Sequence, residues 1–133
     1  MAHSISKVSA AHIAPVFLDK KATTKKALAW MDEASRKGAQ LVVFPESFIP
    51  GFPIWAALWA PLHNHDLFSL FVENSLCVDG PEIQAICQQA KKSQIFVSLG
   101  FSEASPNSVG CIWNSNLLIS DEGEILVHHR KLV

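Results

Sequence analysis

The stretch from Val42 to Pro53 reads Val-Val-Phe-Pro-Glu-Ser-Phe-Ile-Pro-Gly-Phe-Pro. Leu41 to Phe44 form a short apolar run, which predicts a buried β-strand, and Pro45 ends its backbone ladder. A single carboxylate, Glu46, follows at once. Open α/β sheets place their active sites here, just beyond the carboxyl end of a buried parallel strand. Glu46 is therefore a candidate functional residue, although a Glu here could also cap the next helix or pair with a surface Arg.

The composition is that of one globular domain. The chain has 133 residues, 49% of them hydrophobic, and a formal net charge of −1, which favours neither nucleic acid nor an anionic membrane as a partner. The longest weakly polar stretch, Phe48–Leu62, is broken by prolines and is shorter than the ~20 residues that a membrane helix needs. The N-terminal residues lack the apolar segment of a secretory signal. We expect a soluble, cytoplasmic protein.

The first third of the chain predicts a strand–helix–strand unit. Ile5–Ile13 mixes apolar and polar residues as a first strand would. A helix follows, with Thr23 or Thr24 as its predicted N-cap and Gly38 as its stop. Together with the buried run Leu41–Phe44 this makes a βαβ unit, whose strands should be parallel and whose crossover should be right-handed. The predicted buried stripe of the helix consists of Ala27, Met31 and Ala34.

The rest of the chain predicts further helices and strands in an α/β arrangement. Pro61 separates the first two helices, and Pro81 begins the third at its first position. A second buried strand follows that helix, and the last two strands form an antiparallel hairpin at the edge of the sheet. The predicted helices are Ile54–Trp59, Asp66–Asn74 and Pro81–Lys92, and the predicted strands are Gln94–Phe101, Cys111–Ile119 and Glu124–Lys131.

The last predicted strand gives Lys131 an unusual setting. With a period of two, Lys131 shares its face with Ile125 and Val127, whereas Arg130 points to the other face. A lysine on an apolar face usually extends its ammonium into solvent at the end of the strand. If Lys131 is held inside instead, it needs a negatively charged partner, and Glu46 is the candidate.

Histidine and cysteine residues carry weaker signals. The segment 63–66 contains two imidazoles and a carboxylate, but no third ligand stands at a recognised metal spacing, so we favour no metal site there. Cys77, Cys87 and Cys111 match neither a zinc site nor a Cys-x-x-Cys pair, and we interpret them as reduced. Cys87 falls on the apolar stripe of a predicted helix, which favours a small core residue over a nucleophile.

Five segments, taken in order, resemble the nitrilase branch of the carbon-nitrogen hydrolase superfamily along essentially the whole chain. Any one alone would be a modest match, but together they are specific. The extension Ile49–Pro53 after Glu46 resembles nitrilases more than the plain amidases of the family. The five segments are Ala14–Asp19, Phe44–Pro53, Glu73–Ser75, Ser98–Glu103 and His129–Leu132.

This resemblance implies a fold, a mechanism and a class of partner. The fold would be the N-terminal portion of an αββα sandwich, with a mixed sheet and helices on one face. The site would be a Glu-Lys-Cys triad without metal or organic cofactor, in which Glu46 is the general base and Lys131 stabilises the developing negative charge. A nitrile would become a carboxylic acid and ammonia through a thioimidate and a thioester. The partners expected are a small nitrile or amide and, for the parent enzyme, further copies of itself, but neither nucleic acid nor membrane.

Two aromatic residues near Glu46 are candidates for the substrate pocket. Phe52 stands where the family commonly has tyrosine, so it keeps the ring but lacks a hydroxyl donor. Trp55 lies one helical turn from Trp59. Such a pair could line an apolar pocket or an oligomer contact, although filling the core is the commoner role.

The chain also departs from the family pattern. The nucleophilic cysteine of the family lies well downstream of the lysine, and none of the three cysteines here stands in its sequence context. We therefore expect residues 1–133 to form a single carbon-nitrogen hydrolase domain that is incomplete at the C-terminus, leaves an apolar sheet face uncovered and has no turnover by itself. Two alternatives stay open, an amidase of the same superfamily and a non-catalytic truncated subunit or interaction module.

Overall fold

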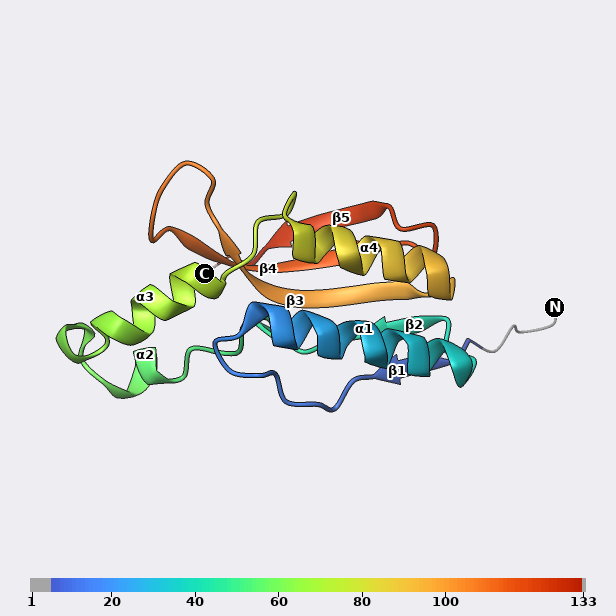
Figure 1. Cartoon of the computed structure of the whole chain (residues 1–133), viewed down its shortest axis with the longest axis horizontal. Coiled ribbons are helices and arrows are strands. Elements are labelled where there is room, and N and C mark those ends of the chain that lie inside the picture. Colours follow the sequence, from blue (N-terminus) through green and yellow to red (C-terminus); the bar gives the residue numbers. More distant parts are fainter. Residues whose placement is uncertain (1–5, 133) are drawn as a thin grey trace.

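The structure, a computed structural model, describes residues 6–132 as a five-stranded mixed sheet with two long helices on one face (Figure 1). The strands lie in sequence order. The first three, β1 (Val8–Ala10), β2 (Leu41–Val43) and β3 (Phe96–Ala104), are parallel. The last two, β4 (Ile112–Ile119) and β5 (Ile125–Arg130), extend the sheet in antiparallel fashion. The predicted βαβ unit and C-terminal hairpin are thus confirmed.

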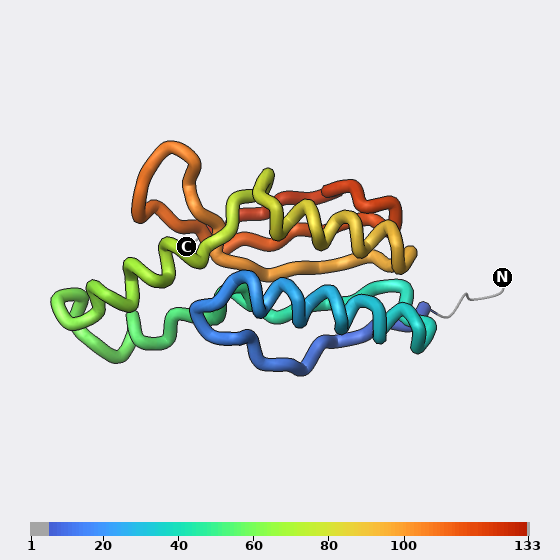
Figure 2. The backbone as a smooth tube through the Cα atoms, in the orientation of Figure 1, coloured from blue at the N-terminus to red at the C-terminus, as the bar shows by residue number. Residues whose placement is uncertain are grey.

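The two long helices, α1 (Lys20–Arg36) and α4 (Pro81–Ser93), lie side by side along the sheet (Figure 2). Each presents an apolar stripe to β2, β3 and β4, because its apolar residues recur at helical spacing. The stripe predicted for the first helix is confirmed. The buried stripe residues are Ala27, Met31 and Ala34 of α1 and Ile83, Ile86 and Ala90 of α4.

The start of α1 corrects a sequence-based expectation. The N-cap is Asp19, whose carboxylate accepts a hydrogen bond from the backbone N–H of Ala22 at 2.9 Å, and not Thr23 or Thr24. Asp caps a helix as well as Thr does. Thr23 is buried one turn inside the helix, where its hydroxyl donates to the carbonyl of Val16 and accepts from the N–H of the same residue. These two hydrogen bonds therefore hold the preceding loop against α1.

Strand boundaries differ from the predicted ones at both ends of the parallel region. Within the described residues β1 covers only Val8–Ala10, and the Ile5 end of the predicted strand lies outside them. Gln94 is not in β3 but adopts the left-handed C-cap of α4, with a φ of 48°. The other end of β3 runs on to Ala104, because β4 pairs with it up to that residue. Pairing with β4 therefore extends β3 beyond the apolar run from which its end was predicted.

Three short helices, α2 (Trp55–Leu58), η1 (Pro61–His63) and α3 (His65–Asn74), project beyond one end of the sheet (Figure 1). They are separated near Pro61, as predicted. The buried Asn64 holds them together, because its amide donates to the backbone carbonyls of Trp55 and Trp59. Among the residues described, no helix is both long and apolar enough to cross a lipid bilayer.

The face of the sheet away from α1 and α4 is half-exposed. Val8 is 56% exposed and Val127, on the outer strand, is 49% exposed. Every residue of β5 is exposed. Apolar side chains of four strands meet there around a shallow depression, lined among others by Val8, Leu41, Phe96 and Leu118.

Candidate active site

Glu46 is carried to its position by a segment that stays paired with β3 after β2 has ended. The backbone N–H of Phe44 donates to Ser98 and that of Phe48 donates to Gly100, at 2.8 and 2.9 Å. Gly100 permits this close approach, because a Cβ there would overlap the carbonyl oxygen of Pro45 and lie 2.9 Å from the Cα of Glu46. The segment that carries Glu46 follows β2 and therefore lies over the half-exposed face of the sheet.

Lys131 reaches the same place from the end of β5, 85 residues along the chain. Its backbone N–H donates to the carbonyl of Asn114 at 2.8 Å, which continues the pairing with β4 by one residue. Its Nζ lies 2.8 Å from Oε1 of Glu46. The side chains of Lys131 and Glu46 are 61% and 48% exposed. The sequence left two settings open for this lysine, and the structure combines them, because the ammonium pairs with Glu46 and still contacts solvent.

Asn114 completes the polar cluster. Its side-chain N–H donates to Oε1 of Glu46 at 2.5 Å, so one carboxylate oxygen accepts from both the amide and the ammonium. These two donors, Lys131 first and Asn114 second, lower the pKa of Glu46 below its usual value of 4.5. Glu46 is therefore a carboxylate at neutral pH, which is the form a general base requires.

A small cavity of about 270 Å³ lies over this cluster. Besides Glu46, Asn114 and Lys131 it is lined by Gly100 and by three polar residues of β4 and β5. Its lining offers one anionic acceptor and several donors within a few ångströms, which suits a small polar reacting group. The three polar residues are Ser115, Asn116 and His129.

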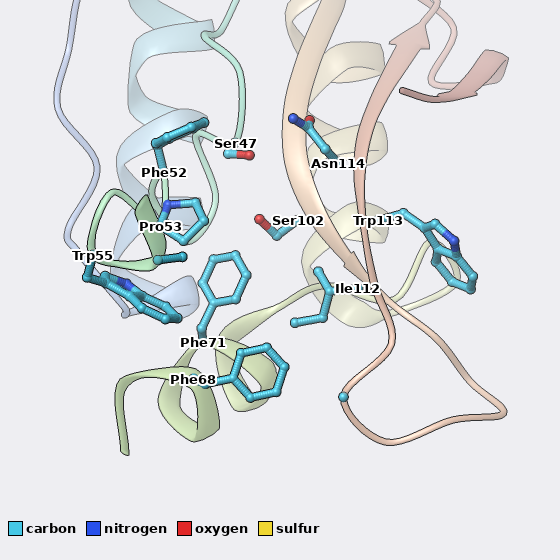
Figure 3. Close-up of a pocket in the computed structure, with 12 residues that line it drawn as sticks. Ser47, Phe52, Pro53, Trp55, Phe68, Phe71, Ser102, Ile112, Trp113 and Asn114 are labelled. Carbon is cyan, nitrogen blue, oxygen red and sulfur yellow. The ribbon is translucent and has the colours of Figure 1, made fainter. Parts of the chain in front are cut away.

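A second cavity, of about 310 Å³, adjoins the first at Asn114 and is mainly apolar (Figure 3). The two sequence-predicted pocket residues, Phe52 and Trp55, both line it, although Phe52 is 55% exposed whereas Trp55 is buried. Trp55 packs edge-on against Phe71 with ring centroids 6.0 Å apart, so it fills the core and lines the cavity at once. In Figure 3 the rings of Phe52, Trp55, Phe68 and Phe71 lie around the opening, on the side of β4 away from Trp113.

The family follows from a comparison with known proteins. The family model described as "Carbon-nitrogen hydrolase" matches residues 7–133. This chain belongs to the carbon-nitrogen hydrolase family. The resemblance drawn from the five sequence segments is therefore confirmed.

Curated relatives of this carbon-nitrogen hydrolase chain are named for nitriles and cyanide. An arylacetonitrilase of Hypocrea virens is 43% identical over 132 residues, which are 99% of this chain and 39% of the relative. The enzyme named nitrilase 2, from an unknown prokaryotic organism, is 41% identical over 123 residues, covering 92% and 39%. A cyanide hydratase of Botryotinia fuckeliana is 38% identical over 128 residues, covering 95% and 33%. The chain thus spans about two fifths or less of the length of these relatives.

Solved structures show that the fold is also that of the superfamily. An amidase from Nesterenkonia sp. superposes with a TM-score of 0.71 at 20% identity, over 100% of this chain and 45% of the amidase. Nit3 of Saccharomyces cerevisiae superposes with a TM-score of 0.73 at 22% identity, over 96% and 44%. At such low identity these matches establish the fold, a mixed sheet with helices on one face.

Sequence reasoning about this carbon-nitrogen hydrolase chain missed Asn114 as part of the cluster. A signal was present, because Asn114 is a polar residue in a mostly apolar predicted strand, and the alternation of side chains limits which neighbours it can face.

Cys77, Cys87 and Cys111 are absent from the linings of both cavities, and burial raises the pKa of the Cys87 thiol. Within residues 6–132 no group of His, Cys, Asp and Glu side chains could hold a metal ion, and that range includes segment 63–66.

Proposed function

We propose that this chain supplies the general base and the charge-stabilising cation of an enzyme that hydrolyses nitriles to carboxylic acids and ammonia. One observation carries the proposal. Glu46 and Lys131, 85 residues apart in the sequence, meet at 2.8 Å beside a small polar cavity. The names of the relatives, nitrilases and a cyanide hydratase, support the choice of a nitrile.

In this proposal Glu46 acts on a thiol. Sulfur is a strong nucleophile only as thiolate, so the carboxylate takes the thiol proton while sulfur bonds to the nitrile carbon. One π-electron pair of the triple bond moves to nitrogen, which is then protonated to give a thioimidate. Water activated by Glu46 adds, the carbon–nitrogen bond breaks and ammonia leaves, so that a thioester remains. A second water releases the acid and restores the thiol.

Lys131 acts where negative charge develops. The ammonium is already held next to the carboxylate, so it need not reorganise when the nitrile nitrogen gains its electron pair. Asn114 donates to the same oxygen of Glu46 that Lys131 binds, and it borders both cavities. We infer that the thiol comes from outside residues 1–133, because the family's nucleophile has a sequence context that none of the three cysteines shares and none of them lines either cavity of the site.

The adjoining aromatic cavity supports an arylacetonitrile as the substrate class. Its volume of about 310 Å³ and its ring-rich lining suit a phenyl group whose nitrile carbon would reach Asn114 and the polar cavity beyond. Within the proposed site Phe52 and Trp55 are the pocket residues that contact the aryl group. A Phe at position 52 gives the ring an apolar neighbour without a hydroxyl group.

A chimera tests the proposed function. The aligned 132 residues of this chain would replace the matching segment of the Hypocrea virens arylacetonitrilase, and ammonia release from phenylacetonitrile would be measured. We expect activity in the chimera and losses of about 10² to 10⁴-fold in Glu46→Gln and about 10² to 10³-fold in Lys131→Met. The matched controls are Glu33→Gln and Lys37→Met, which break an exposed Glu–Lys pair of 2.7 Å on α1, remote from the site.

The same assay separates the alternatives. Greater ammonia release from phenylacetamide than from phenylacetonitrile would indicate an amidase instead. The 133-residue chain alone should release no ammonia from either compound, and repeated turnover by it would contradict an external thiol. A folded chimera that stays inactive on both compounds, while the relative itself is active, would favour a non-catalytic subunit.

A further inference from the structure

Directly behind the Glu46 cluster, on the helix-covered face, lies a second carboxylate with more partners. Glu103 of β3 has a side chain only 3% exposed. Its Oε2 accepts from the hydroxyl of Ser115 at 2.6 Å and lies 2.7 Å from Nε2 of His128. Arg130 donates to both oxygens, from Nη2 to Oε1 at 2.5 Å and from Nε to Oε2 at 3.2 Å. Such a two-point contact fixes the orientation of a guanidinium as well as its position.

Trp113 closes the other side of Arg130. The guanidinium carbon lies 3.7 Å from the centroid of the indole ring, within the range of a cation–π contact. Trp113 is the strand partner of Glu103, and Ser115 is the strand partner of Arg130. The carboxylate, the ring and the guanidinium therefore occupy neighbouring positions on three adjacent strands.

The two clusters share their strands. On β4, Trp113 contacts Arg130 and the next residue, Asn114, binds Glu46. On β5, Arg130 binds Glu103 and the next residue, Lys131, binds Glu46. Consecutive residues of a strand point to opposite faces, so a contact that fixes the direction of one side chain also fixes the direction of the next. In Figure 3 Trp113 and Asn114 leave β4 on opposite sides.

The end of β5 has few other contacts among the described residues. All six of its residues are exposed, so no packed core holds it in register. Its C-terminal end is joined to β4 by backbone bonds, the last from Lys131 to Asn114. The register shift between Leu118 and Ile119 lies near the start of β5, opposite Ile125 and Val127, and so away from Arg130 and Lys131.

We propose that Glu103 is a positioning residue: by holding Arg130 on the helix-covered face, it fixes the twist and register of the end of β5 and so keeps Lys131 against Glu46. This role rests on the proposed function only for its catalytic consequence. The placement of Lys131 can be measured without any turnover.

The test is a carboxyl ¹³C NMR titration of Glu46 in the 133-residue chain. The hydrogen bond from Lys131 is the largest cause of the lowered pKa of Glu46, so loss of that contact raises this pKa toward 4.5. We expect Glu103→Gln to produce a large part of the rise that Lys131→Met produces. Glu33 is an internal control, because its pKa is lowered by Lys37 on α1 and should stay unchanged.

Two further variants separate positioning from stability. Ile83→Ala removes a buried core contact of α4 and should destabilise the chain without changing the pKa of Glu46. The double variant Glu103→Gln/Arg130→Met has no guanidinium for position 103 to hold, so it should raise the pKa of Glu46 to the same extent as Glu103→Gln. An unchanged Glu46 pKa in Glu103→Gln, or an equal rise in Ile83→Ala, would overturn the proposal. The NMR titration does not depend on turnover. An inactive chimera would therefore contradict the proposed function without contradicting the positioning role of Glu103.

Discussion

Arg130 and Lys131 are adjacent in the sequence, and each binds a carboxylate on a different face of the sheet. Arg130 binds the buried Glu103, and Lys131 binds the half-exposed Glu46. In the first pair only the carboxylate is buried, and the second pair is open to a cavity. The alternation of a strand thus lets one dipeptide serve stability on one face and the proposed chemistry on the other.

Removing the cation should raise the pKa of Glu46. In Lys131→Met the carboxylate loses its largest stabilising hydrogen bond, and in Asn114→Leu it loses the second. We expect both variants to raise the Glu46 pKa in an NMR titration, Lys131→Met by more. The free energy of unfolding should change by less than about 1 kcal/mol in Lys131→Met, because an exposed ion pair adds little. A Glu46 pKa that does not change in Lys131→Met would show that the pair does not form in solution.

Stability should depend on pH through Glu103. Burial by itself would raise the pKa of Glu103, but hydrogen bonds from Arg130, Ser115 and His128 outweigh it and lower this pKa from 4.5 to about 2. A lowered pKa in the folded state stabilises the fold above pH 4.5, and that contribution is lost progressively as the pH falls from 4.5 through the folded-state pKa of about 2.

The measurement is urea unfolding of the native chain and Glu103→Gln across that pH range. Above pH 5 the variant should be less stable by up to about 3 kcal/mol, and the difference should shrink steadily as the pH falls toward 2. Glu33→Gln serves as the control, since its pair with Lys37 is exposed. A difference that is constant with pH would mean that folding does not lower the pKa of Glu103.

Gly100 should tolerate no side chain. In Gly100→Ala the new Cβ would overlap the carbonyl oxygen of Pro45 and press on the Cα of Glu46, and both are backbone atoms that cannot rotate away. We expect a loss of about 1 to 3 kcal/mol in unfolding free energy, together with a displaced NMR signal for the Glu46 carboxyl carbon. Ser98→Ala, two residues earlier on the same strand face, should leave that signal in place. Equal behaviour of the two variants would contradict the close packing of β3 against the Glu46 segment.

Substitution of Phe52 should affect substrate binding, whereas substitution of Trp55 should affect stability. Phe52→Ala removes a half-exposed ring and should change the unfolding free energy by no more than about 0.5 kcal/mol. Trp55→Ala removes a buried ring packed on Phe71 and should lose about 3 kcal/mol or more. In the chimera Phe52→Ala should raise KM for phenylacetonitrile more than it lowers kcat. An unchanged KM would place the aryl group outside the aromatic cavity.

Much of this arrangement could be predicted from the sequence, because its signals are local. The apolar run before Pro45, the helical stripe of Met31 and the alternation before Lys131 each indicated an element that the structure contains. The cap of α1 was mispredicted, because Asp19, Thr23 and Thr24 are all good caps and only the loop contacts of Thr23 decide among them.

The contacts between strands were beyond the sequence. Whether Asn114 meets Glu46, or Trp113 meets Arg130, depends on the register of β3, β4 and β5, and a shift by one residue would exchange the two faces. The hydrophobic pattern fixes that register only where a face is buried, which is not so along β5. The buried network of Glu103 was therefore found only in the folded arrangement.

The measurement that tests the central claim most directly is a double-mutant cycle on the chimera. Ammonia release from phenylacetonitrile would be compared for Glu46→Gln, Lys131→Met and the double variant. Because the two side chains are proposed to act as one unit at 2.8 Å, the double variant should be about as slow as the slower single variant. Losses that multiply, as for independent residues, would contradict a joint role for Glu46 and Lys131.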